Sequence, residues 1–363
     1  MQLRNPWHDF DWVLFGAILT LSAISVVEIY SATLYGQEHS AAFRQLIWIG
    51  IGTVLLFIVA AMDYHIISEQ IPWLYLAGIG VLLYTLALGR MVSGSRSWIV
   101  IGPMRFQPSE FVKIIVVIAI ARYLSELREV RYLSLEQIIK ASLICGIPIV
   151  LVALQPDLGT TITFLPILGV GLLIRGMKPI MLIVLVLIFL LALPLSWPFL
   201  AQHQRDRITN FVNPEQDLKG SGYQVNQSKI AIGSGGALGK GVFKGSQNKL
   251  GFLPTRHTDF ILSVVGEELG FAGVAVTLGL LGFILFRAVY TAQSARDELG
   301  LFMVMGVFGI YFFHVVENVG MVIGFMPMTG IPLPFMSYGG SSIMAAFAAM
   351  GLVISVRRRR YVN

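Results

Sequence analysis

The chain of 363 residues is 56% hydrophobic and 13% charged, with a mean hydropathy of +0.76. A soluble globular domain carries roughly 25% charged residues, so this composition excludes an ordinary soluble protein. The net charge of +6 comes from basic residues scattered among short polar segments. That distribution argues against a nucleic-acid partner and favours an anionic lipid surface or an anionic substrate. The one cysteine, Cys145, excludes an intrachain disulfide.

Long apolar blocks occur along the whole chain. A transmembrane helix needs about 20 predominantly apolar residues, and lipid cannot satisfy the backbone of irregular segments. The pattern therefore predicts an all-α polytopic membrane protein, with residues 1–363 forming a single integral membrane domain of about ten transmembrane helices. The expected spans are 11–33, 43–62, 72–90, 108–126, 137–154, 158–175, 179–200, 259–287, 300–324 and 336–356.

The distribution of Lys and Arg predicts the orientation of these spans. An even number of spans places both termini on one side of the membrane. The short segments on that side carry thirteen basic residues and those on the other side carry five. By the positive-inside rule, the N- and C-termini are therefore expected in the cytoplasm. No small-residue cleavage site follows the first apolar run, so we expect it to be retained as the first helix.

The remaining eight basic residues lie in one long polar segment, 201–258, between the seventh and eighth spans. This orientation makes the segment a large extracytoplasmic loop. Loops of this length are usually functional or disordered. Interleaved apolar residues such as Ile230, Leu238 and Phe243 argue against disorder, and we expect the loop to pack over the helices.

Ionisable residues inside membrane spans are costly, so each is a candidate functional residue. Glu110 and Lys113 are three residues apart on one helix face, a spacing that permits an ion pair. A pair that neutralises itself is favoured over catalysis, although it could orient a substrate. Asp157 is expected to cap the sixth span. At least one of Glu267 and Glu268 is expected to face the interior, where a structural partner or an ion path would both suit it.

Asp259 begins the eighth expected span and follows Arg256, His257 and Thr258. Aspartate is favoured at a helix start, so an N-cap is one interpretation. The other is a general base at the boundary between water and lipid, and the two roles are compatible. Burial would raise the pKa of this carboxyl, whereas the helix start and Arg256 would lower it, so the sequence does not decide the direction.

Three further features lie near the outer ends of the spans. His314 and Glu317 are three residues apart, and a hydrogen-bonded interior pair is favoured over a metal site. Trp98 is expected to anchor an outer loop at the interface, or alternatively to stack on a sugar. Residues 327–341 contain three prolines and three glycines, a composition that excludes a regular helix and indicates an outward-facing cavity.

Several motifs resemble those of the SEDS family (shape, elongation, division and sporulation), in the same order along the chain. Arg105 and Arg256, together with the short C-terminal tail, resemble the RodA-type elongation branch more than the division branch. Thr255 stands where relatives often have an acidic residue, a departure that does not affect Asp259. The motifs are RFQPSE (105–110), QPDLGT (155–160), QSKIAIGSGG (227–236), FLP (252–254), RHTDFI (256–261), PLP (332–334) and SYGGS (337–341).

The resemblance implies a peptidoglycan glycosyltransferase that joins lipid II units into polyprenyl-linked glycan strands for cell elongation. It also implies an inner-membrane location, a class B penicillin-binding protein as transpeptidase partner, other membrane proteins of the elongation complex, and an essential Asp259. The expected substrate-binding residues are Trp98, Arg205, Arg207, Lys249, Arg256, His257 and Ser337, and the expected orienting residues are Arg105, Glu110, Lys113 and Asp157.

The chemistry requires a base for the attacking sugar hydroxyl and positive charge for the departing pyrophosphate. A single base predicts inversion at the anomeric carbon. No motif indicates a metal site, and any Mg²⁺ would arrive with the pyrophosphate. Two alternatives remain: a flippase that transports the lipid-linked sugar, and a scaffold that only holds the penicillin-binding protein. The absence of an internal repeat argues weakly against the flippase.

Overall fold

The computed structural model describes residues 9–34, 40–92, 94–102, 104–127, 132–181, 197–212 and 220–360, together with residues 183, 184, 187, 188 and 191. Seven helices in these parts of the chain are long and apolar enough to cross a membrane. The fold is therefore that of a polytopic, mainly α-helical membrane protein, as predicted. These helices are α1 (Trp12–Thr33), α2 (Ala41–Ala61), α4 (Ile71–Leu88), α6 (Leu135–Ala153), α14 (Gly270–Gln293), α15 (Glu298–Val322) and α16 (Gly340–Arg358).

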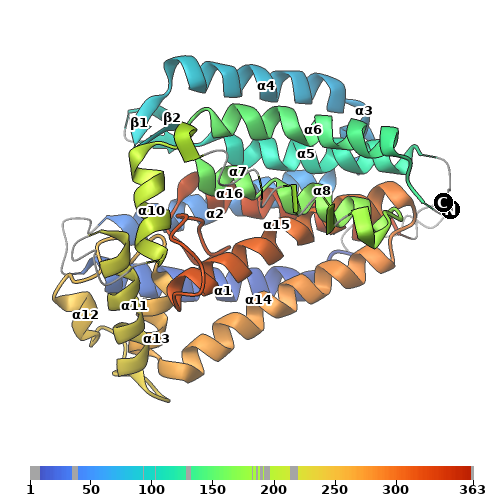
Figure 1. The fold of residues 1–363 in the computed structure, drawn as a ribbon. Coiled ribbons are helices and arrows are strands. Elements are labelled where there is room, and N and C mark those ends of the chain that lie inside the picture. The colour runs from blue at the N-terminus through green and yellow to red at the C-terminus, as the bar shows by residue number, and fades with distance from the viewer. Residues whose placement is uncertain are drawn as a thin grey trace.

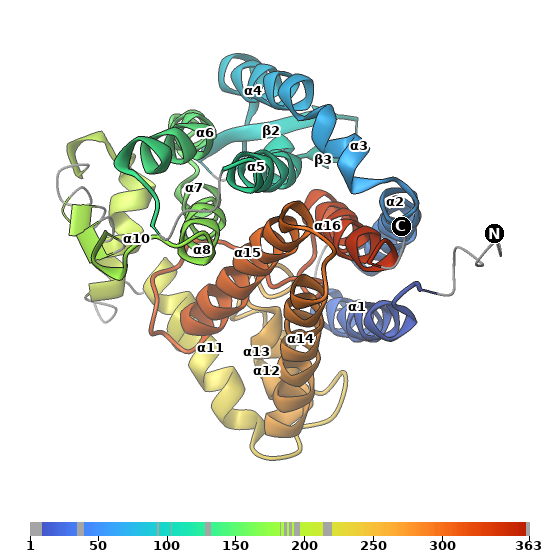
Figure 2. The ribbon, with the colours of Figure 1, turned by 90° about the vertical axis from the view of Figure 1, so that its right-hand side faces the viewer.

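Shorter helices complete the bundle. The expected span 158–175 divides into α7 and α8, and ten of the 22 residues of the expected span 179–200 lie outside the described residues. Helix α5 carries Glu110, Lys113 and Arg122, yet it lies inside the bundle between α4 and α15 (Figure 2). Helix α5 (Pro108–Ser125) is as long as α4, and the shorter helices are α3 (Tyr64–Glu69), α7 (Leu158–Ile162), α8 (Leu165–Ile174), α10 (Gln202–Val212), α11 (Ser221–Gly235), α12 (Ser246–Lys249), α13 (Ile261–Glu268) and the 3₁₀ helix η1 (Trp197–Phe199).

The two ends of the described chain meet at one end of the bundle. Asp11 caps α1 by accepting a hydrogen bond from the Leu14 N–H at 3.0 Å. The same carboxylate pairs with Arg287 of α14 at 2.6 Å and with Arg357 of α16 at 3.1 Å. Helices α10 to α13 lie at the opposite end (Figure 1). The Asp11 end of α1 and the C-terminal end of α16 therefore lie side by side.

The eighth expected span, 259–287, is not one continuous helix. Helix α13 ends at Glu268, and α14 begins at Gly270, which has a φ of +66°. A Cβ atom at Gly270 would lie only 2.3 Å from the Gly239 nitrogen. The glycine therefore permits a close backbone contact that separates the membrane span from the short helix preceding it.

The segment 201–258 contains α10, α11 and α12, so it is more regular than its composition predicts. It packs on the helices as expected, because the Lys240 and Gly241 N–H groups bond to the carbonyls of Glu267 and Glu268 at 3.0 and 2.9 Å. The Ser228 hydroxyl donates to the Val322 carbonyl of α15 at 2.7 Å. Residues 213–219 lie outside the described part of this segment.

Glu267 and Glu268 each have structural partners, which is one of the two interpretations that the sequence left open. Glu267 pairs with Lys240 at 2.7 Å. Glu268 accepts the Ser31 hydroxyl at 2.5 Å and the Phe243 N–H at 2.8 Å. These contacts join the C-terminal end of α13 to α1 and to the segment after α11.

A small antiparallel sheet, which the sequence does not predict, lies at the end of the bundle near α10 (Figure 1). Its strands are β1 (Arg90–Val92), β2 (Ser95–Ile101) and β3 (Met104–Phe106), in the order β1-β2-β3. Between α15 and α16, residues 323–339 form no regular helix. This confirms the irregular backbone expected from the prolines and glycines.

Substituting Gly235 tests how tightly α11 packs on α13. A Cβ atom at this position would lie 1.9 Å from the Gly266 carbonyl oxygen, whereas one at Gly233 meets open space. Thermal unfolding in detergent should show Gly235→Ala destabilised by about 1–3 kcal/mol through overpacking. Gly233→Ala should be unchanged or stabilised by up to about 1 kcal/mol, since alanine has the higher helix propensity. Equal stability of the two variants would contradict this packing.

Candidate functional site

Asp259 lies in a turn before α13. The Thr255 carbonyl accepts the N–H groups of Thr258, Asp259 and Phe260, at 3.1 to 3.3 Å. The N-cap of α13 is Phe260, and it makes no side-chain capping bond. The capping interpretation of Asp259 is therefore wrong, and its carboxylate is not committed to the helix start.

One amide in the membrane core fixes the position of this turn. Asn318 of α15 is fully buried, and its Nδ2 donates to the carbonyls of Asp259 and Ile331, each at 2.9 Å. The Tyr338 N–H donates to the His257 carbonyl at 2.9 Å. The turn and the irregular segment 323–339 are thus joined to each other and to α15.

Arg207 of α10 reaches the same point. Its Nη1 donates to the Thr329 carbonyl at 3.0 Å. A methyl group on Gly330 would lie 3.7 Å from Asp259 Oδ2 and 4.0 Å from Arg207 Nη1. Burial raises the pKa of the Asp259 carboxyl, while the Arg207 charge and a hydrogen bond from Thr258 act in the opposite direction. A raised pKa makes this carboxylate a stronger base.

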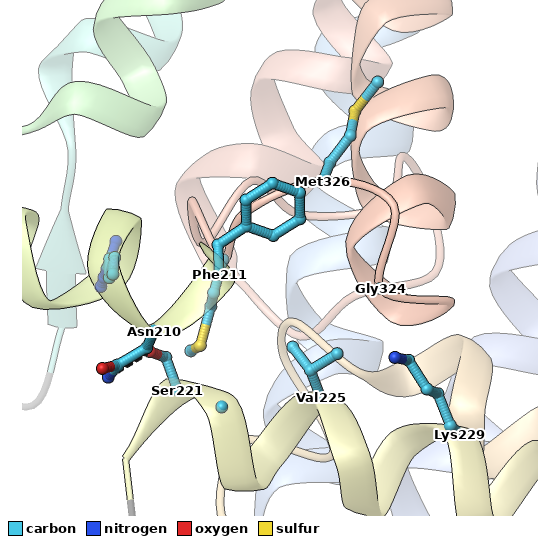
Figure 3. Close-up of a pocket in the computed structure, with 10 residues that line it drawn as sticks. Asn210, Phe211, Ser221, Val225, Lys229, Gly324 and Met326 are labelled. Atoms are coloured by element: carbon cyan, nitrogen blue, oxygen red, sulfur yellow. Dashed lines mark hydrogen bonds between the residues drawn. The ribbon is translucent and has the colours of Figure 1, made fainter. Parts of the chain in front are cut away.

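A shallow hollow, partly open to solvent, lies beside Arg207. Figure 3 shows α10, α11 and the segment after α15 converging on it, with Lys229 and Val225 extending from α11. Two cationic side chains and several apolar ones share this space, so the hollow is suited to a ligand with both an anionic and an apolar part. Its lining residues are Arg207, Asn210, Phe211, Ser221, Gly222, Val225, Lys229, Gly324, Met326 and Met328.

Not all of the expected basic residues reach this hollow. Arg205 donates instead to the Pro198 carbonyl at 2.9 Å, and Lys249 is exposed on α12. Neither lines the hollow, whereas Lys229, which the sequence does not single out, does. Whether a basic side chain points into the hollow depends on the path of α10 to α12. That path cannot be read from the sequence of this segment, because its apolar residues follow no regular period.

Three expected substrate-binding residues serve to hold the backbone. Arg256 Nε donates to the Ala32 carbonyl at 2.6 Å, which ties the turn to α1. The His257 ring lies against Tyr338, with 5.5 Å between the ring centroids. The Ser337 hydroxyl is buried and accepts the N–H of Leu333 at 2.8 Å. None of the three lines the hollow.

The orienting pair Glu110–Lys113 is buried, with 2.8 Å between the charged atoms, as expected for a pair that neutralises itself. Lys113 Nζ also lies 3.4 Å from His314 Nε2, and His314 Nδ1 lies 3.2 Å from the Pro332 carbonyl. The pair therefore connects α5, through α15, to the irregular segment 323–339.

The other expected residues lie around these elements. Asp157 caps α7 by accepting the Thr160 N–H at 3.1 Å, as predicted, and it also accepts a hydrogen bond from Gln107 at 3.0 Å. Trp98 is half-buried on β2 and Arg105 is exposed on β3. Neither of the last two lines the hollow.

His314 and Glu317 do not form the expected pair among the described residues. Glu317 instead accepts the Thr329 hydroxyl. The described part of the chain contains no group of three or more His, Cys, Asp or Glu side chains that could hold a metal ion. Sequence reasoning missed the role of Asn318, although an amide in a membrane span beside a carboxylate is a signal that could have found it.

Comparison with known proteins places the chain among cell-wall enzymes. Residues 9–362 match the cell cycle protein family FtsW/RodA/SpoVE. The peptidoglycan glycosyltransferase MrdB of Escherichia coli (strain K12) is 38% identical over 345 residues, 94% of this chain and 92% of that protein. The peptidoglycan glycosyltransferase RodA of Treponema pallidum (strain Nichols) is 32% identical, covering 99% of this chain and 100% of that protein.

Two solved structures resemble the fold along its whole length. One is a chain from a peptidoglycan synthase complex, described in terms of the structural coordination of polymerization and crosslinking. It matches with a TM-score of 0.85 and 32% identity, covering 98% of this chain and 100% of that chain. The other is the rod shape determining protein RodA of Thermus thermophilus, with a TM-score of 0.75 and 30% identity, covering 99% and 100%.

Replacing Asn318 tests how the site is held. Asn318→Ala leaves the carbonyls of Asp259 and Ile331 without their donor, and each unpaired buried group costs about 1–3 kcal/mol. We expect a clear fall in the detergent melting temperature. Asp259→Asn is the matched control, because its carboxylate does not cap a helix, and it should melt near the wild type. A larger loss for Asp259→Asn would contradict this structural role.

Proposed function

The chain belongs to the FtsW/RodA/SpoVE family, also called the SEDS family, and from this premise we propose that Asp259 is the general base of its peptidoglycan glycosyltransferase reaction. The enzyme joins lipid II units into glycan strands for cell elongation, as expected of the RodA-type branch. One observation carries the assignment. Asp259 is a carboxylate not used in helix capping that lies close to Arg207, and Arg207 in turn lines the amphipathic hollow.

In the proposed reaction the acceptor sugar's 4-hydroxyl attacks the anomeric carbon of the donor. A bond forms between that oxygen and the anomeric carbon, and the bond from this carbon to the polyprenyl pyrophosphate breaks. Asp259 takes the hydroxyl proton, and pyrophosphate leaves with the bonding electrons. One attack from the face opposite the leaving group inverts the anomeric configuration. General-base catalysis of this kind contributes about 10²–10⁴-fold.

We assign the pyrophosphate to Arg207 and Lys229. Both line the hollow, and positive charge fixed beside a leaving phosphate stabilises the transition state. Phe211, Val225 and Met326 form the apolar part of the lining and suit the first isoprene units of the lipid. Arg207 faces Asp259 as well, so one residue connects the base to the leaving-group side.

We propose no resident metal or other cofactor. Arg207 lies close to the two acids Asp259 and Glu317, and its positive charge disfavours a divalent cation there. Mg²⁺ that enters would be carried by the pyrophosphate oxygens. It would supply further positive charge at the leaving group, while Arg207 and Lys229 hold that group in place.

The protein is a multi-pass membrane protein, and we place it in the bacterial cytoplasmic (inner) membrane with both termini inside. The excess of basic residues at the Asp11 end supports this orientation; Arg4, Arg128 and Arg131 of that set lie outside the described residues. The site at the α10–α13 end is then extracytoplasmic, as is the loop 201–258. Substrate on that side has already crossed the membrane.

We further propose a class B penicillin-binding protein as partner, within the elongation complex of membrane proteins. The similarity to a chain from a synthase complex with coordinated polymerization and crosslinking supports a transpeptidase that receives the nascent strand. The flippase and the scaffold alternatives fit the site less well. Neither requires a carboxylate close to a cation that lines the hollow.

Replacing Asp259 by asparagine removes the base and nearly preserves the shape of the side chain. Purified enzyme with its partner, whose transpeptidase is blocked by a β-lactam, should convert lipid II into glycan chains. Asp259→Asn should slow this by about 10²–10⁴-fold. Asp206→Asn, at an exposed position on α10, is the control and should retain full activity. Polymerisation by Asp259→Asn at the normal rate would refute the mechanism.

Substituting two lysines in turn tests whether the pyrophosphate binds at the hollow or at the exposed surface. Lys229→Gln removes positive charge from the lining and should lower kcat by about 10–100-fold. This loss is smaller than the one caused by removing a hydrogen-bond donor that acts directly on the transition state. Lys249→Gln changes the charge equally but at an exposed position, so its rate should stay within about twofold of the wild type. Steady-state polymerisation assays over a range of lipid II concentrations measure both. The opposite order would place the pyrophosphate near α12.

A further inference from the structure

Glu317 is a buried carboxylate that the mechanism above does not use. It lies on α15 with 2% of its surface exposed. One of its oxygens accepts the Thr329 hydroxyl, and the other, Oε2, is buried without a hydrogen-bond partner among the described residues. A buried ionisable group with an unused oxygen inside a membrane protein is costly to retain, so it calls for a functional explanation.

Thr329 and Gly330 connect this carboxylate to the catalytic base. The Thr329 side chain bonds to Glu317, and its carbonyl accepts Arg207 Nη1 at 3.0 Å. The adjoining Gly330 faces both Asp259 Oδ2 and Arg207 Nη1. Two consecutive residues of the irregular segment 323–339 thus bring together two acids and one guanidinium.

The balance of charge at this point decides how Asp259 behaves. The charged groups gathered around Thr329 and Gly330 are Asp259, Arg207 from α10 and Glu317 from α15. A cation paired with one carboxylate alone lowers that group's pKa by about 1–3 units and weakens it as a base. A second carboxylate sharing the cation counters this effect.

We propose that Glu317 is a positioning residue and the second carboxylate of the site. Acting with Thr329, it keeps the Arg207 guanidinium between two acids, so that Arg207 does not close onto Asp259 and the base stays available to the sugar hydroxyl. Glu317 does not touch the reacting atoms. The inference rests on the proposed role of Asp259 as general base.

The pH dependence of kcat/KM tests this inference. Glu317→Gln removes the negative charge but keeps an oxygen for the Thr329 hydroxyl. The acid limb of the profile, where Asp259 takes up its proton, should then move to lower pH by about one unit, because Arg207 is left opposite Asp259 alone. The plateau rate should fall by up to about tenfold, since the base is weaker.

Glu317→Asp is the rescuing variant, because it restores the charge on a shorter side chain. Its acid limb should return toward the wild-type position. A loss of rate in Glu317→Gln at every pH, with no movement of the limb, would mean a purely structural role and would overturn the inference. Detergent melting and elution profiles confirm that each variant is folded.

Failure of the inference is distinguishable from failure of the proposed function. If Asp259→Asn polymerises lipid II normally, the general base is wrong and Glu317 has nothing to position. If Asp259→Asn is inactive but the profile of Glu317→Gln superimposes on that of the wild type, only the role of Glu317 is refuted. A shifted limb together with an inactive Asp259→Asn supports both.

Discussion

The Asn318 amide is the interaction on which the site depends. It donates to two carbonyls, one in the turn of Asp259 and one in the irregular segment, within a membrane protein where water cannot take its place. Without that bridge two non-helical segments would each carry unsatisfied backbone at membrane depth. Together with the bond from the Tyr338 N–H to the His257 carbonyl, this buried side chain holds the turn of Asp259 and the irregular segment against α15.

The remaining parts of the site are arranged around this bridge. Arg207 arrives from α10, Glu317 from α15, and Lys229 from α11, so three elements distant in sequence supply the charge. Arg256 ties the turn to α1, and Glu268 ties the C-terminal end of α13 to the same helix. These charged groups are held in place by the protein before substrate binds. Charges fixed in this way can stabilise developing charge without having to reorganise.

Much of this could be predicted from the sequence, and the rest could not for physical reasons. Apolar length revealed most spans, and proline with glycine revealed the irregular segment. The break at Gly270 was hidden because it depends on contact with Gly239, far away in the chain. The family resemblance indicated Asp259. Identifying Lys229, rather than Lys249, as a residue that lines the hollow required the path of α11 and α12, since charge alone does not show which way a side chain points.

The most direct measurement is a cryo-EM structure of the inactive Asp259→Asn enzyme with lipid II bound. The attacking 4-hydroxyl should lie within about 3.2 Å of the side chain at position 259. The pyrophosphate of the donor should contact Arg207 and Lys229, and its isoprenoid should follow the apolar lining of the hollow. A sugar hydroxyl bound to a different carboxylate, with position 259 remote from it, would contradict the assignment of the catalytic base.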